Sequence, residues 1–203
     1  MNRVFILLFA SIFLCLPCAE ALANVGKPDQ SVIFLKNQIS AGYFNEDLFD
    51  PDFPRPPSPI FWHAVKKMRS GVMMMYQRLL YHNHSRFSLY FGASLSRWKR
   101  FDQVIYAPSI FIAMRYWFIR TREVNFYLSY SVAGPTVLNT QHLAEKNLGS
   151  HFIFQDYLGL GVQFGKKHAL NVDLRLVHYS NGDLFTHNPG FDVPVVLYLG
   201  YSF

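Results

Sequence analysis

His178 and Ser180 are the residues whose types and spacing most clearly suggest chemistry. They end a run of alternating residues, and in an extended strand alternate side chains point to the same face. At a rise of roughly 3.3 Å per residue their Cα atoms are about 6.6 Å apart, which lets an imidazole nitrogen reach a serine oxygen. Such a pair can make the serine a nucleophile for acyl transfer. A histidine at the end of an apolar face is also common as an interface or capping residue, so the pair needs support from its surroundings.

The loop after Ser180 supplies further groups that acyl transfer needs. Its glycines and proline allow the chain to fold back over the strand end, and Asn188 and Asp192 follow within a dozen residues. An acid near His178 would hold the imidazole ring and stabilise the imidazolium. An amide such as that of Asn188, or the backbone N–H of Gly182, would stabilise an oxyanion.

The same stretch resembles a known protein family. Residues 178–182 read His-Tyr-Ser-Asn-Gly, residues 188–192 read Asn-Pro-Gly-Phe-Asp, and the last strand ends in Phe. These segments resemble the PagL family of outer-membrane lipid A 3-O-deacylases. A looser similarity continues upstream through Ala133-Gly134-Pro135 and residues 154–161.

The resemblance implies a role for each of these residues. Ser180 corresponds to the family nucleophile, His178 to its general base, and Asn181 and Asn188 to residues near the oxyanion. Asp192 stands where the family usually has Glu, and because Asp is one methylene shorter, the loop must approach His178 more closely. The implied reaction is hydrolysis of the 3-position acyl ester of lipid A with release of a 3-hydroxy fatty acid, and it needs no metal or cofactor.

The N-terminus has the features of a secretory signal peptide. Arg3 precedes an apolar run that is too short to span a membrane well, and Ala-Leu-Ala at 21–23 is typical of a cleavage site. We therefore expect residues 1–23 to be removed and residues 24–203 to form one domain. A lipoprotein anchored through Cys18 is the alternative.

Composition narrows the class of the mature chain. Both cysteines, Cys15 and Cys18, lie in the expected signal peptide, which excludes a disulfide, a zinc–thiolate site and a cysteine nucleophile from the mature chain. Aromatic residues make up 17% of the sequence, and no mature stretch approaches 18 uninterrupted apolar residues. The net charge of +6 favours anionic lipid headgroups as partners, since export argues against nucleic acid. The sequence leaves the oligomeric state open, a homodimer included.

Alternating apolar and polar residues predict the strands that position the site. The proline-rich stretch 45–66 excludes a central strand and leaves room for a short helical turn over 61–67. Connections alternate between long and short, as expected of external loops and periplasmic turns. We therefore predict an all-β, eight-stranded antiparallel transmembrane β-barrel. The expected strands are 31–44, 72–81, 87–96, 103–119, 123–132, 150–165, 169–180 and 193–203.

This topology makes strand 169–180 rise outward and places His178 and Ser180 at the outer leaflet, on the lipid-facing side. The outer membrane is then the expected location, and the resemblance implies lipid A or lipopolysaccharide in that leaflet as the substrate. Simple alternation along strand 193–203 puts Asp192 on the lumen side, unless Asp192 precedes regular pairing. Two other classes of function stay open: a non-catalytic structural or adhesive barrel, and another lipid enzyme such as a phospholipase or a lipid A acyltransferase.

Overall fold

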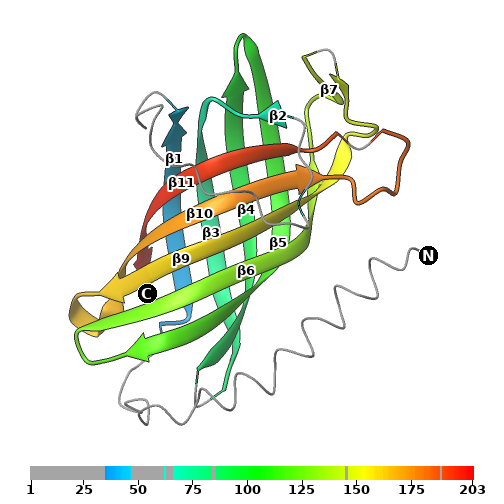
Figure 1. The fold of residues 1–203 in the computed structure, drawn as a ribbon. Coiled ribbons are helices and arrows are strands. Elements are labelled where there is room, and N and C mark those ends of the chain that lie inside the picture. The colour runs from blue at the N-terminus through cyan, green and yellow to red at the C-terminus, as the bar shows by residue number, and fades with distance from the viewer. Residues whose placement is uncertain (1–34, 47–61, 63–65, 84–85, 145, 188) are drawn as a thin grey trace.

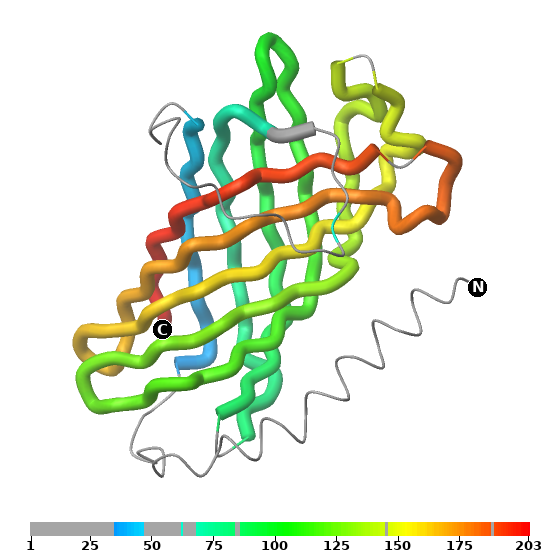
Figure 2. The backbone as a smooth tube through the Cα atoms, in the orientation of Figure 1, coloured from blue at the N-terminus to red at the C-terminus, as the bar shows by residue number. Residues whose placement is uncertain are grey.

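The protein is a closed β-barrel of eight long strands (Figures 1 and 2). A computed structural model describes residues 35–46, 62, 66–83, 86–144, 146–187 and 189–203, so the expected signal peptide lies outside the described residues. The barrel strands are β1 (Asn37–Asn45), β3 (Ser70–His82), β4 (Phe87–Arg100), β5 (Gln103–Arg120), β6 (Val124–Val137), β9 (Phe152–Phe164), β10 (Leu170–Ser180) and β11 (Phe191–Ser202). The short elements are β2 (Lys66–Lys67), β7 (His142–Leu143), β8 (Lys146–Asn147) and the 3₁₀ helix η2 (Lys166–His168).

Each long strand pairs antiparallel with its neighbours in the sequence, and β1 pairs with β11 to close the ring. The closing pairs run from Gln38 opposite Ser202 to Tyr43 opposite Leu197. Closure leaves no free sheet edge in the apolar zone, which is the requirement for a sheet in lipid. The predicted fold class and strand number are therefore confirmed.

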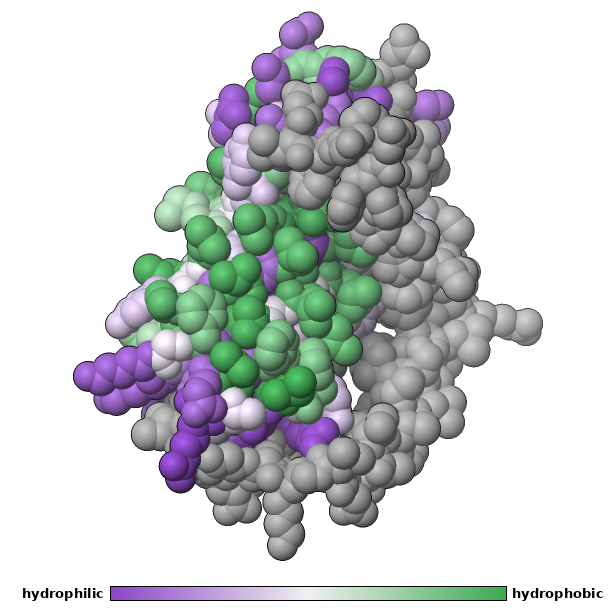
Figure 3. All heavy atoms as spheres, turned by 60° about the vertical axis from the view of Figure 1, so that its left-hand side comes forward, coloured by the Kyte–Doolittle hydropathy of each residue, from purple (hydrophilic) through white to green (hydrophobic). Residues whose placement is uncertain are grey.

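The alternation in the sequence separates two surfaces. Along β4, Phe91 and Leu95 point outward and are exposed, whereas Ser94 and Ser96 are buried in the lumen. The same separation holds in the other strands, and Figure 3 shows apolar side chains forming a band between hydrophilic ends. An outward apolar band with a polar interior is typical of a transmembrane barrel. In the described residues there is no helix long and apolar enough to cross a membrane.

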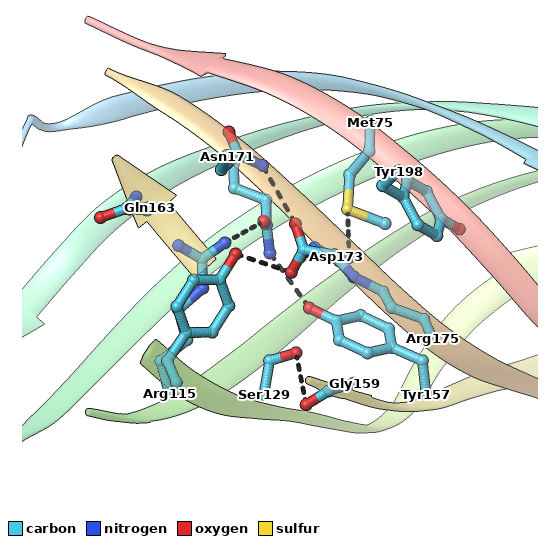
Figure 4. A network of polar contacts seen from close by, with 12 residues as sticks. Met75, Arg115, Ser129, Tyr157, Gly159, Gln163, Asn171, Asp173, Arg175 and Tyr198 are labelled. Atoms are coloured by element: carbon cyan, nitrogen blue, oxygen red, sulfur yellow. Dashed lines mark hydrogen bonds and ion pairs between the residues drawn. The ribbon is translucent and has the colours of Figure 1, made fainter. Parts of the chain in front are cut away.

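The lumen is filled by charged and aromatic side chains (Figure 4). The guanidinium of Arg115 lies between the rings of Tyr90 and Tyr127, at 4.3 and 4.5 Å from their centroids. That of Arg175 lies 4.6 Å from each of two further tyrosine rings, Tyr157 and Tyr198. Cation–π contact of this kind stabilises a charge that has left water. The barrel interior is therefore a packed core.

Asp173 supplies the negative charge of this network. Its Oδ1 lies 3.4 Å from Arg175 Nη2 and accepts a hydrogen bond of 2.6 Å from the Tyr127 hydroxyl, while Oδ2 accepts one of 3.0 Å from Asn171 Nδ2. Gly161 faces this cluster, and a Cβ there would collide with Tyr127 and Asp173. The glycine is needed because two side chains occupy the space beside its backbone.

Several connections differ from their predicted form. Between the expected strands 87–96 and 103–119 there is only a turn at Phe101 and Asp102, because β4 and β5 continue past the apolar band as one hairpin. The loop after β6 contains the small hairpin β7–β8. The expected helical turn over 61–67 is wrong at its end: Lys66 and Lys67 form strand β2, which pairs parallel with the start of β11. Here tertiary pairing overrides a weak local preference.

Replacing Asp173 by Ala should destabilise the barrel strongly. Two buried guanidiniums would lose their carboxylate, and uncompensated buried charge typically costs about 3–5 kcal/mol. The free energy of unfolding can be measured by urea titration, followed by the mobility difference between folded and unfolded barrel on gels. Asp183→Ala, in an exposed loop, is the control and should change stability by less than about 0.5 kcal/mol. Equal unfolding midpoints for the two variants would contradict the role given to Asp173.

Candidate active site

His178 and Ser180 lie on the outward face at the end of β10. Val177 and Tyr179, which alternate with them, are fully buried in the lumen. The strand end therefore presents the imidazole and the hydroxyl side by side on the outside of the barrel. The antiparallel partners of His178 are Asp156 on β9 and Asp192 on β11, so a carboxylate-bearing residue lies on each side of it.

A β-bulge brings Asp192 to the same face. Arg175 pairs with Val196 but Val177 pairs with Val193, so β11 has one residue more than β10 between these pairs. An extra residue reverses the alternation beyond it and re-aims the side chains. On the far side of the bulge the odd-numbered residues Leu197 and Leu199 face outward. On the near side the even-numbered Asp192 faces outward, because the bulge has shifted the alternation by one residue. The simple alternation, which put Asp192 in the lumen, is wrong for this reason, and Asp192 is regularly paired with His178.

His178 and Asp192 are in direct contact. The imidazole Nδ1 lies 2.7 Å from Asp192 Oδ1, and both side chains are almost completely buried. A carboxylate only accepts, so Nδ1 carries the proton in this contact and Nε2 is left as the basic nitrogen. The shorter Asp side chain thus reaches the histidine. Ser180 is two positions farther along the strand, at a Cα separation of about 6.6 Å for regular strand geometry.

Two aromatic residues inside the barrel hold the strand ends together beneath this pair. Tyr179 and Phe191 are cross-strand partners, and their rings stack at 4.6 Å between centroids. The Tyr179 hydroxyl accepts a hydrogen bond of 3.0 Å from Trp98 Nε1 and donates one of 3.0 Å to Gln155 Oε1. Tyr179 is adjacent in sequence to His178 and Ser180, and Phe191 is adjacent to Asp192. The packed lumen therefore fixes the backbone that carries the outward groups.

Asp156 lies on the outward face of β9, opposite a second bulge. Ser131 pairs with Tyr157 and Gly134 with Gln155, so β6 contains one extra residue between these pairs. Ala133 in this bulge has a positive φ of 53°, and its N–H donates to the Asp156 carboxylate. Asp156 thus binds the backbone of the bulge on one side and lies beside His178 on the other.

Asn181 and Gly182 begin the loop that follows Ser180. Asn181 is buried, and its Nδ2 donates to the carbonyls of Leu148 and His187 at 3.1 and 2.9 Å. The Asn181 side chain thereby joins this loop to the connection between β6 and β9. Gly182 is exposed with a φ of 62°, a conformation that favours glycine. Asn188, the other expected oxyanion residue, lies outside the described residues, and the oxyanion roles stay predictions.

Trp62 is part of the site, although no sequence pattern indicated it. Its indole stacks on the His178 imidazole, with 5.3 Å between ring centroids and 10° between ring planes. An aromatic residue in a proline-rich stretch carries no periodic signal, so only the fold reveals the contact. The Arg175 side chain does not reach this outer face, because it is buried in the lumen. Within the described residues no three His, Cys, Asp or Glu side chains gather to hold a metal ion.

Comparisons with known proteins identify the family to which the chain belongs. The sequence profile of the family "Lipid A 3-O-deacylase (PagL)" matches residues 70–202, which include β3 to β11 and the whole His178–Asp192 site. The chain belongs to this family. The resemblance inferred from residues 178–192 is thereby confirmed.

One curated relative and one solved structure extend the match. "Lipid A deacylase PagL" of Bordetella bronchiseptica is 36% identical over 73 residues, which span 36% of this chain and 39% of the relative. The crystal structure of "the outer membrane enzyme PagL" superposes with a TM-score of 0.57 at 17% identity, covering 82% of this chain and 99% of that one. At this identity the superposition shows that the two share the barrel fold.

The 2.7 Å contact predicts a specific protonation state of His178. In ¹⁵N-histidine-labelled protein, we expect Nδ1 to carry a proton that resonates far downfield because it is shared with a carboxylate. The signal should vanish in Asp192→Ala. Asp156→Ala removes the carboxylate on the other side and is the matched control, in which the signal should persist. Loss in the Asp156 variant alone would assign the orienting acid to β9 instead of β11.

Proposed function

We propose that the chain is a serine esterase of the outer membrane that hydrolyses the 3-position acyl ester of lipid A. The observation that carries this proposal is the His178–Asp192 pair on the outward face, with Ser180 beside it on the same strand face. The site lies on the outer side of the barrel at the end of β10, where a lipid ester would lie at the depth of the leaflet. Family membership supports lipid A as the lipid.

The proposed reaction has two steps. Nε2 of His178 takes the hydroxyl proton as Ser180 Oγ attacks the ester carbonyl, and the imidazolium then gives that proton to the departing sugar oxygen. Water hydrolyses the resulting acyl-enzyme by the reverse use of His178 and releases a 3-hydroxy fatty acid. Asp192 holds the Nδ1–H tautomer and stabilises the imidazolium. Asn188 and the Gly182 backbone are the proposed donors to the oxyanion. Asn181 has a supporting role, because its amide already donates to the carbonyls of Leu148 and His187 and so holds the loop in place.

The position of the site explains how a water-insoluble substrate can be bound. The leaflet restricts the substrate to two dimensions, and the apolar outer face that ends at His178 solvates its acyl chains. Both effects lower the entropic cost of bringing the ester to the serine. A purely structural barrel would have no need for a hydrogen-bonded imidazole–carboxylate pair on its lipid face, because burial of such a pair is costly.

Ser180→Ala should abolish deacylation. When the wild-type gene is expressed in a host with unmodified lipid A, mass spectrometry should show loss of one hydroxyacyl group. The serine variant should leave the lipid A mass unchanged, with a rate reduced by about 10⁴-fold or more, since no nucleophile remains. Folding of the variant is checked by its gel mobility. Release of fatty acids from glycerophospholipids, with lipid A untouched, would instead support the phospholipase alternative.

Asp192→Ala should lower the rate by about 10²–10⁴-fold, because the imidazole would lose both its tautomer preference and the charge that stabilises its protonated form. The matched control is Asp183→Ala, at an exposed aspartate in the loop between β10 and β11, which should retain nearly full activity. Initial rates of hydroxy fatty acid release from purified lipid A decide the comparison. Similar losses in the two variants would remove Asp192 from the mechanism.

A further inference from the structure

His178 is much less exposed than its position on the barrel predicts. Leu174, on the same outward face of β10, is 49% exposed, whereas His178 is only 3% exposed. Trp62 accounts for part of this difference, since its indole covers the imidazole and is itself 7% exposed. The general base of the proposed reaction is therefore shielded by a residue from a distant part of the chain.

The stacking geometry is specific. An interplanar angle of 10° at 5.3 Å between centroids is an offset parallel stack, one of the preferred arrangements of aromatic pairs. Trp offers the strongest aromatic surface for a cation. When His178 takes up the serine proton, the positive charge develops on the ring that faces this surface. The contact is therefore stronger in the transition state than in the resting enzyme.

The chain that carries Trp62 is anchored on the carboxylate strand. Shortly after Trp62, β2 pairs parallel with Phe191 and Asp192, on the edge of β11 that lies beyond the last pair with β1. The N–H of Met68 donates to the carbonyl of Asp192 at 2.9 Å, and the Met68 side chain is fully buried. The backbone that positions the carboxylate thus also fixes the end of the segment that carries the indole.

We propose that Trp62 is a positioning residue for the general base. It keeps the imidazole plane fixed, so that Nδ1 stays on Asp192 and Nε2 remains the nitrogen available to Ser180, and its ring face stabilises the imidazolium. This inference rests on the proposed esterase function and deepens it. Because the imidazolium forms only during the reaction, loss of the indole face lowers kcat and leaves KM for lipid A nearly unchanged.

A series of three substitutions separates ring stacking from simple coverage. Trp62→Phe keeps an aromatic face, Trp62→Leu keeps apolar bulk without one, and Trp62→Ala removes both. We expect kcat to fall by no more than about threefold in the Phe variant and by about tenfold or more in the Leu and Ala variants, from the usual strength of a desolvated cation–π contact. The control is Phe91→Leu, an outward aromatic on β4 at the opposite side of the barrel, which should leave kcat unchanged.

The experiment uses the full-length protein in detergent micelles, with lipid A as substrate and hydroxy fatty acid release as the rate. In parallel, ¹³C-histidine NMR reports the stack itself: the indole should shift the ring-proton signals of His178 upfield, and this shift should disappear in the Leu and Ala variants. Full kcat in Trp62→Leu, a loss confined to KM, or an unmoved His178 signal in Trp62→Leu would each overturn the positioning role. A wild-type protein that releases no fatty acid from lipid A would overturn the proposed function instead, and the NMR comparison would still decide the stack.

Discussion

Closure of the sheet through the β1–β11 pairing is the constraint on which the rest of the structure depends. Lipid offers no hydrogen-bond partners, so each backbone N–H and C=O in the apolar zone must be paired within the ring. A closed ring of eight strands encloses little space, and the tyrosines, arginines and Asp173 fill it. Buried charge inside the barrel is thereby compensated locally, by cation–π contacts and by one carboxylate. The outer surface is left free to combine an apolar band with a small polar site at its rim.

The site results from two local departures from regular pairing. In a regular barrel, alternation alone would decide which side chains face the lipid, and Asp192 would not join His178. The bulge near Pro194 on β11 reverses the alternation and turns Asp192 outward. The bulge at Ala133 on β6 binds the carboxylate of Asp156 on the other side of the histidine. The interior stack of Tyr179 on Phe191 holds both strand ends in register, so the rigid lumen supports the chemistry on the outside.

Much of the fold could be predicted because period-two alternation is a strong local signal. The expected strand 169–180, which carries His178, differs from β10 by one residue at its start. The outward faces of β4, β6 and β9 follow directly from the alternation in their sequences. Prediction was less accurate where alternation stops. The β4–β5 hairpin extends beyond its expected end, and Lys66–Lys67 form a strand because the free upper edge of β11 pairs with them. A local pattern does not contain information about such a distant edge.

Sequence alone is enough to place His178 and Ser180 on one shared face, since they are two positions apart on a single strand. The side to which Asp192 points, and the residue that covers His178, follow from the folded arrangement of several strands. The outward position of Asp192 depends on a bulge that is defined by pairing between two strands. Trp62 contacts His178 from the stretch before β2, the short strand that pairs parallel with β11. Both are set by long-range pairing, whereas a side-chain alternation is set by the backbone geometry of one strand.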